Sequence, residues 1–244
     1  MHQKISRENR EMEKQKKNYT KRDVSDFTEN KYRFQLFARF VILKLFAPLF
    51  YKIEYIGKEN IPTDRNFIVA GNHISYFDPV LAGEIVNQPL AYMGKIELFE
   101  KPIMAAICDG LGCFAVNREK LEVSTIKTAL NIFKTDRWRL GIFPQGGIRR
   151  NRKIEKINKG FAAIARQMKT DILPLGIVGC EEYNWNPLKR KKIKVTLGEP
   201  VSYNQELDAI FDEWGQKVAA LTGYEYVKEE PVQQEEKETV SQTN

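Results

Sequence analysis

Apolar and polar positions alternate with two different periods along most of this chain. Short apolar runs, typical of buried strands, occupy 53–56, 67–70, 90–93, 113–116, 138–143, 172–178 and 192–197. Segments with apolar residues three and four positions apart, typical of helices, occupy 77–87, 98–108, 120–135, 155–168 and 204–222. Because strands alternate with helices, we predict an α/β fold with a mostly parallel central sheet flanked by helices.

Two of the predicted helices carry an apolar stripe that we expect to face the core. The stripe of the last helix runs from Leu207 through Trp214 to Leu221. The stripe of the 120–135 helix consists of Val123, Ile126, Leu130 and Phe133. In α/β sheets of this kind, binding sites collect where strands end and helices begin.

A different pattern precedes the first strand. Residues 31–52 are rich in Phe and Leu, but Arg39, Lys44 and Pro48 interrupt the apolar run, which is too short to span a bilayer. We predict an N-terminal interfacial amphipathic helix, with Arg33, Arg39 and Lys44 extending toward water. The side chains expected to enter the headgroup region are Phe37, Phe40, Val41 and Leu45. The alternative is an ordinary helix buried in the core.

Composition divides the rest of the chain. Residues 1–30 and 228–244 are highly charged and lack apolar periodicity, so we expect a disordered leader and a disordered tail around one domain at 53–227. The formal net charge of +7 favours anionic partners. The cysteines Cys108, Cys113 and Cys180 have neither a zinc nor a disulfide spacing, which indicates small buried side chains in a reduced, cytosolic protein without a signal peptide.

The candidate chemistry centres on one histidine. The chain has two, and His2 lies in the charged leader, whereas His73 follows the predicted strand 67–70 and precedes Asp78 by five residues. An imidazole titrates near neutral pH and can take a proton from a hydroxyl, and a carboxylate on its other nitrogen would orient it. The alternative is a purely structural pair, with Asp78 capping the helix that starts near Pro79.

Two further segments end predicted strands with basic residues. The strand 113–116 leads to Arg118, and the strand 138–143 leads through a turn with Gly146 and Gly147 to Arg149. Glycines let backbone N–H groups approach an anion, and arginine binds phosphate through two parallel hydrogen bonds. Each segment alone is weak evidence, because a surface arginine is common.

The order of these segments resembles the lysophospholipid and glycerol-3-phosphate acyltransferase family, with the bacterial 1-acylglycerol-3-phosphate acyltransferase as its nearest type. That family carries Asn-His-x4-Asp, then Gly-x-Phe-x3-Arg, then Phe-Pro-Glu-Gly-Thr-Arg-Ser, then an apolar strand with a proline. The matching residues are Asn72, His73, Asp78, Gly112, Phe114, Arg118, Phe143, Pro144, Gly146, Arg149 and Pro174. Gln145 and Gly147 depart from the expected Glu and Thr, which leaves the acceptor less defined.

The resemblance implies acyl transfer from acyl-CoA or acyl carrier protein to the hydroxyl of a lysophospholipid, most simply 1-acylglycerol-3-phosphate, giving phosphatidic acid. His73 would be the base and Asp78 would orient it, with no metal and no cofactor beyond the acyl donor. The residues expected to hold the acceptor phosphate are Arg118, Arg149, Lys95, Gly146 and Gln145. We expect a peripheral protein on the cytoplasmic face of a membrane.

Two other classes of function remain open from the sequence. A non-catalytic lipid-binding or membrane-remodelling protein could keep the same fold. A nucleic-acid-binding protein would explain the charge, but the usual recognition motifs are missing. The basic clusters at 150–159 and 189–194 suit either anionic headgroups or an acidic carrier protein.

Overall fold

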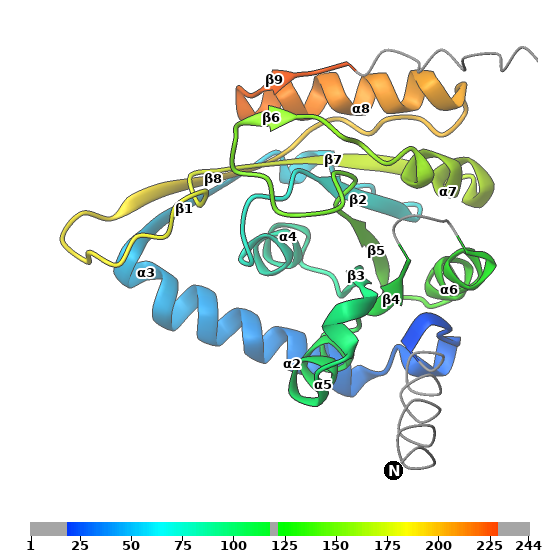
Figure 1. Ribbon diagram of the computed structural model, residues 1–244, viewed down its shortest axis with the longest axis horizontal. Coiled ribbons are helices and arrows are strands. Elements are labelled where there is room, and N and C mark those ends of the chain that lie inside the picture. The colour runs from blue at the N-terminus through cyan, green and yellow to red at the C-terminus, as the bar shows by residue number, and fades with distance from the viewer. Residues whose placement is uncertain (1–18, 118–121, 229–244) are drawn as a thin grey trace, which may run out of the picture.

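The computed structural model describes residues 19–117 and 122–228, and a seven-stranded sheet forms its centre (Figure 1). The strand order is β1-β8-β7-β2-β5-β3-β4. The strands are β1 (Tyr51–Ile56), β2 (Phe67–Gly71), β3 (Leu90–Lys95), β4 (Phe114–Val116), β5 (Arg139–Ile142), β7 (Asp171–Val178) and β8 (Lys191–Leu197). All seven predicted strands are therefore present, and the predicted α/β class is confirmed.

Most of the sheet is parallel. β2 runs parallel to both of its neighbours, β5 and β7, and β3 runs parallel to β5 and β4. β8 pairs antiparallel with β7 and parallel with β1, so these two strands run in the opposite direction. Every residue of β2 is buried, as expected for a strand covered on both faces. The carboxyl ends of β2, β5, β3 and β4 consequently meet at one edge of the sheet.

Helices cover both faces of the sheet. They are α4 (Asp78–Val86), α5 (Pro102–Gly110), α6 (Val123–Phe133), α7 (Gly160–Met168) and α8 (Leu207–Thr222), with short 3₁₀ turns η1 (Val24–Asp26), η3 (Lys58–Asn60) and η4 (Ile96–Phe99). In Figure 1, α8 lies on one side of β7 and β8, and α4 lies on the other. The indole of Trp214 in α8 donates a hydrogen bond to the carbonyl of Ala70 (3.0 Å), which fixes α8 on β2.

The predicted helix at 155–168 begins later than expected. Residues Lys153–Ile154 form strand β6, which pairs with β9 (Glu225–Tyr226) in a small separate sheet. Lys156 then takes a left-handed conformation (φ 52°), and α7 starts only at Gly160. A two-residue strand has no periodicity of its own, so the sequence pattern could not reveal it.

The predicted apolar stripe of α6 is only partly buried: Phe133 packs against the core, whereas Val123 and Leu130 are exposed. Val123 is 67% exposed, and the buried side chains include Thr125, Thr128 and Ala129. Ala129 and Ile132 pack in the main core, and the segment 19–28 covers Thr128: the backbone N–H of Arg22 donates to the Thr128 hydroxyl (3.0 Å). The hydroxyl in turn donates to the carbonyl of Thr20 (3.3 Å).

The expected disorder of the leader is therefore wrong for residues 19–30. Arg22 is buried and pairs with Asp109, while the Asn131 amide donates to the Arg22 carbonyl (2.8 Å). The ring of Phe27 packs against Trp138 with centroids 5.4 Å apart. Residues 1–18 and 229–244 lie outside the described residues, so the expectations for them stay predictions.

The N-terminal helix buries two polar side chains and exposes many apolar ones. It comprises α2 (Glu29–Arg39), the π-helical stretch η2 (Phe40–Phe46) and α3 (Ala47–Phe50). Its buried stripe contains Gln35, Arg39, Leu43 and Ala47. A spacing of four residues drifts by about 40° per step on an α-helix, and the wider π-helical turns offset that drift.

Polar side chains on the buried stripe fasten this helix to the core. The Gln35 amide donates to the carbonyls of Leu90 (2.8 Å) and Leu111 (2.7 Å), and its oxygen accepts from the N–H of Leu90 (3.3 Å). Arg39 donates to the carbonyl of Gly83 in α4. Arg39 therefore lies inside the protein, and the expectation that it extends toward water is wrong.

The opposite face of the helix exposes apolar side chains. They are Phe34, Leu36, Phe37, Phe40, Leu45, Phe46 and Leu49. The sequence left open an interfacial helix or an ordinary helix buried in the core. One face of this helix is buried in the core, and the other exposes apolar side chains. Within residues 19–117 and 122–228, none of the helices combines the length and the apolar character needed to cross a bilayer.

We predict that Gln35→Leu destabilises the protein although it makes the helix more apolar. The substitution removes the partners of buried backbone groups at Leu90 and Leu111, at a cost of about 1–3 kcal/mol. Chemical denaturation measures this change in unfolding free energy. Phe37→Leu, at an exposed position two residues away, is the control and should change it little; equal stability of the two variants would contradict the anchoring role.

Candidate active site

The side chains of His73 and Asp78 form a direct pair. His73 Nδ1 lies 2.7 Å from Asp78 Oδ2, and the carboxylate is completely buried. The backbone N–H groups of Ile74 (2.6 Å) and Ser75 (2.8 Å) also donate to Oδ2. These donors stabilise the ionised carboxylate, which therefore accepts the proton of Nδ1. The remaining ring nitrogen, Nε2, is left as a proton acceptor.

The local sequence holds this pair in place. Asn72, just after β2, donates its amide to the carbonyl of Ile177 (2.8 Å) and accepts from the N–H of the same residue (2.8 Å), so it ties the strand end to β7. Asp78 is the first residue of α4 and Pro79 the second, where a missing N–H costs nothing. The N-terminus of α4 also favours the negative charge of Asp78.

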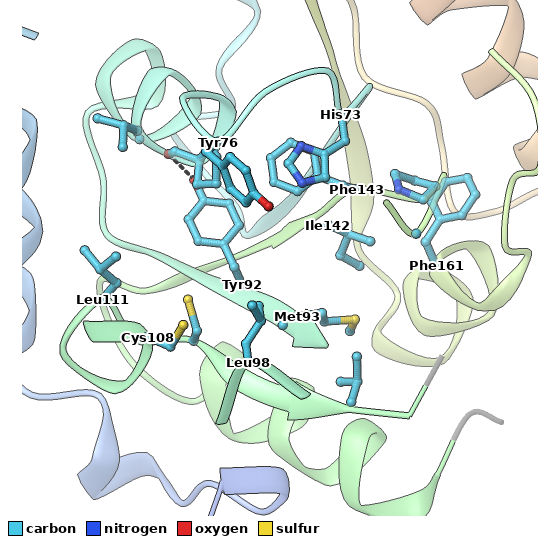
Figure 2. Close-up of a pocket in the computed structure, with 18 of the residues that line it drawn as sticks. His73, Tyr76, Tyr92, Met93, Leu98, Cys108, Leu111, Ile142, Phe143 and Phe161 are labelled. Atoms are coloured by element: carbon cyan, nitrogen blue, oxygen red, sulfur yellow. Dashed lines mark hydrogen bonds between the residues drawn. The ribbon is translucent and has the colours of Figure 1, made fainter. Parts of the chain in front are cut away.

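The imidazole faces a cavity of about 420 Å³. The His73 ring stacks on Phe143 with centroids 4.4 Å apart, and Phe143 in turn stacks on Tyr92 (5.8 Å). Figure 2 shows His73 and Tyr76 at one end of this cavity and Leu98 and Cys108 toward the other. The hydroxyl of Tyr92 donates to the carbonyl of Pro79 (2.6 Å), so its polar group does not interrupt the apolar wall.

Several elements line the cavity with apolar side chains. Val80 and Gly83 come from α4, Ala38 from α2, and Met104 and Ile107 from α5. Apolar walls of this extent, with few polar groups near one end, are typical of sites that bind a small apolar molecule or chain. Burial keeps the pKa of the Tyr92 hydroxyl well above its usual range, so this group stays neutral.

Arg149 lies beside the histidine. Its backbone N–H donates to the carbonyl of His73 (2.7 Å), and Arg150 Nε donates to the carbonyl of Ile74 (3.3 Å). The turn after β5 therefore runs along the loop after β2. The Nε of Arg149 is buried and has no hydrogen-bond partner among the described residues. Arg149 contacts His73 through its backbone and does not line the cavity, so its role as a phosphate ligand stays a prediction.

The structure gives Gly146 and Gln145 roles in the turn itself. The N–H of Gly146 donates to the carbonyl of Phe143 (2.9 Å), and its φ of 68° is one that glycine adopts readily. The buried amide of Gln145 donates to the carbonyls of Lys153 (3.0 Å) and Glu155 (3.4 Å). Both donors thus have partners within the turn, while Gly146 also lines the cavity, and a phosphate-binding role for Gly146 and Gln145 stays a prediction. A glutamate at 145 would have no hydrogen to donate there.

Of the other two expected phosphate ligands, Lys95 and Arg118, only Lys95 belongs to the described residues. Lys95 ends β3 with an exposed side chain, two strands away from β2 in the sheet, and it does not line the cavity. Arg118 lies outside the described residues, although β4 ends two positions earlier, at the same edge of the sheet. Both roles stay predictions.

One residue of the site was missed from the sequence. The sequence indicates only a small buried side chain at Cys180, but this residue lies two positions after β7 and its thiol donates to Asp78 Oδ1 (3.6 Å). The thiol is completely buried, and burial together with the Asp78 charge raises its pKa, so it stays protonated. Cys180 thus supplies a donor to the carboxylate oxygen that His73 does not use.

Comparison with known proteins agrees with this geometry. A family model described as acyltransferase matches residues 52–178, from the second residue of β1 to the last of β7, and this range includes the His73–Asp78 pair. The chain belongs to the acyltransferase family. It is thus an enzyme that transfers acyl groups to oxygen, and the alternative of a non-catalytic protein on the same fold is set aside.

Individual relatives carry more specific names. A 1-acyl-sn-glycerol-3-phosphate acyltransferase of Bacillus subtilis is 29% identical over 160 residues, 65% of this chain and 78% of that protein. One of Borreliella burgdorferi is 30% identical over 149 residues, 60% of this chain and 57% of that protein. A crystal structure of the 1-acyl-sn-glycerophosphate acyltransferase from Thermotoga maritima has the same fold, with a TM-score of 0.60 at 23% identity over 78% of this chain and 79% of that one.

We predict that Cys180→Ala lowers kcat of this acyltransferase about 3- to 10-fold, the worth of one weak hydrogen bond. With one donor fewer, the carboxylate holds the imidazolium more strongly, so the acid limb of the kcat/KM profile moves to higher pH. Cys180→Ser keeps a donor and should lie between Ala and wild type. A drop in activity without a shifted profile would indicate a packing role only.

Proposed function

We propose that this acyltransferase moves a fatty acyl group from an acyl thioester, on coenzyme A or acyl carrier protein, to the free hydroxyl of 1-acylglycerol-3-phosphate, giving phosphatidic acid. The observation that carries the proposal is the His73–Asp78 pair (2.7 Å) at the wall of an apolar cavity. The names of the relatives from Bacillus subtilis and Borreliella burgdorferi support lysophosphatidate as the acceptor.

The geometry supports a direct transfer. His73 Nε2 takes the proton of the acceptor hydroxyl while its oxygen forms a bond to the thioester carbonyl carbon. The carbon–sulfur bond then breaks, and the leaving thiolate receives the proton from the imidazolium, which returns His73 to its neutral form. Asp78 stays ionised throughout and stabilises the imidazolium between the two steps.

The cavity suits the acyl chain. Its walls are formed by apolar side chains of α2, α4 and α5, and a chain lying there has its thioester near His73 at one end. Binding the chain in this way holds the carbonyl carbon close to the incoming hydroxyl, and positioning of this kind accounts for several kcal/mol of barrier lowering in enzymes.

The acceptor phosphate belongs near Arg149 in this proposal. The backbone of Arg149 is bonded to the carbonyl of His73, and its buried Nε has no partner among the described residues; both observations support a phosphate contact by this residue. Lys95, the last residue of β3, and Arg118, two positions after β4, complete the proposed set. No resident cofactor or metal takes part in the scheme.

The proposal also includes attachment of the protein to a membrane surface. The exposed face of α2, η2 and α3 carries phenylalanine and leucine side chains, while the opposite face packs on α4. Contiguous apolar surface of this kind marks an interaction site, and a helix in the plane of the bilayer buries it. We therefore propose a peripheral enzyme on the cytoplasmic face of a membrane.

We predict that His73→Ala lowers the release of free thiol from acyl-CoA in the presence of lysophosphatidate by about 10²- to 10⁴-fold, because the general base is lost. His2→Ala, which removes the other histidine, is the matched control and should keep full activity. Turnover of His73→Ala within a few-fold of wild type, in a protein with an unchanged melting temperature, would rule out the mechanism.

We predict that Arg149→Ala raises KM for the lysophosphatidate acceptor about 10- to 100-fold, the worth of one charge-assisted hydrogen bond, and leaves KM for acyl-CoA nearly unchanged. Arg65→Ala is the control, because it removes the same charge between β1 and β2, away from the loop that carries His73. Comparing lysophosphatidate with a lyso-lipid that lacks a phosphate monoester tests the same contact: equal use of both acceptors would exclude the phosphate role.

A further inference from the structure

The connection between β7 and β8, residues 179–190, exposes two large apolar side chains. Trp185 is 76% exposed and Leu188 is 93% exposed. The connection is nevertheless well bonded: the Asn184 amide donates to the carbonyl of Lys189 (2.9 Å), and the N–H of Leu188 donates to Asn186 Oδ1 (2.9 Å). These apolar side chains are therefore displayed by an ordered turn.

This turn is fastened to the end of the N-terminal helix. The Asn184 amide also donates to the carbonyl of Phe50 (2.9 Å), and its N–H donates to the Tyr51 hydroxyl (2.7 Å). The ring of Trp185 lies edge-on to Phe50 with centroids 5.8 Å apart. In Figure 1 the β7–β8 connection extends beside and beyond α3. The exposed face of the helix and the tip of the connection thus adjoin each other.

The charged side chains at the tip of this connection, residues 183–190, are all basic. From Tyr183 to Arg190 the chain contains Lys189 and Arg190 and no acidic residue. Lys191 follows and pairs with Glu182 (3.3 Å), which leaves the tip itself basic. An exposed Trp and Leu next to basic residues fit the boundary between the headgroups and acyl chains of an anionic bilayer, where tryptophan is enriched.

We propose that the β7–β8 connection is a second membrane anchor, in which Trp185 and Leu188 insert into an anionic bilayer while Lys189 and Arg190 contact its headgroups. The inference rests on the proposed function for the lipid substrates and adds a second contact point to the N-terminal helix. Tyr183, in the same connection, lies against Phe77 (6.1 Å) and under the guanidinium of Arg150 (5.3 Å).

The contacts of Tyr183 connect the β7–β8 connection to the loop that carries His73. Phe77 belongs to the loop that carries His73, and Arg150 donates to the carbonyl of Ile74 in that loop. An inserted connection therefore holds the bilayer surface next to the His73 end of the cavity, from which a lysophospholipid can move to the imidazole without crossing water.

Tryptophan fluorescence tests the anchor directly. The other two tryptophans, Trp138 and Trp214, are 3% and 0% exposed, so a bilayer can reach only Trp185 among the three. With vesicles of phosphatidylglycerol and phosphatidylcholine, we expect a blue shift of the emission and quenching by lipids brominated on their acyl chains. The emission of Trp185→Phe should not respond to the same vesicles.

A binding experiment completes the test. Trp185→Ser combined with Leu188→Ser should lower the partition coefficient onto these vesicles about 10- to 100-fold, because both apolar side chains are lost from the interface. Val123→Ser, which alters an exposed apolar residue on α6, is the control and should bind like wild type. Unchanged binding of the double variant, or wild-type emission that brominated lipid does not quench, would overturn the proposal.

Two further measurements distinguish the membrane anchor from binding of acyl carrier protein and from failure of the proposed function. A response of Trp185 to acyl carrier protein but not to vesicles would also overturn the membrane anchor. In detergent micelles, where no bilayer is needed, the double variant should transfer acyl groups from acyl-CoA to lysophosphatidate at the wild-type rate. Loss of that activity would contradict an anchoring role, whereas a wild-type enzyme inactive in micelles and on vesicles would instead remove the proposed function.

Discussion

The structure around the site depends on one buried carboxylate. Asp78 has no exposed surface, and a buried negative charge is tolerated only when donors surround it. Here two backbone N–H groups and His73 donate to Oδ2, and the thiol of Cys180 donates to Oδ1. The same contacts that stabilise the charge shape the loop after β2 and set the tautomer of His73. Asp78 therefore contributes both to the structure of this loop and to the proposed chemistry of His73.

The direction of the strands brings the remaining groups to this carboxylate. Because β2, β5, β3 and β4 are parallel, the segments that follow them all emerge at one edge of the sheet. β5 lies directly beside β2, so the turn that carries Arg149 runs against the His73 loop and bonds to its backbone. The more distant strands β3 and β4 bring Lys95, and the chain leading to Arg118, to the same edge but further from His73.

The N-terminal helix shows how a helix can be both part of the core and a contact surface. Its buried stripe carries Gln35 and Arg39, whose hydrogen bonds satisfy backbone groups at Leu90, Leu111 and Gly83. Its other face exposes seven large apolar side chains between Phe34 and Leu49, whose contact with water is unfavourable. The adjoining β7–β8 connection repeats this arrangement with Trp185 and Leu188. The two elements together form the apolar surface that the proposed membrane contact would bury.

Local sequence patterns predict the class of the fold and the pairing of His73 with Asp78, and the structure contains both. Strand positions follow from local apolar runs, and the five-residue interval between His73 and Asp78 is bridged by a short loop, so both are local properties of the chain. The burial of Thr128 in α6 depends on tertiary contacts, because residues 20 and 22 bond to it from more than 100 positions away. The same holds for Arg39, for the amide of Gln145, and for Cys180, which reaches Asp78 from another strand. These outcomes depend on contacts between distant segments, and the periodicity of a single segment contains no information about its partners.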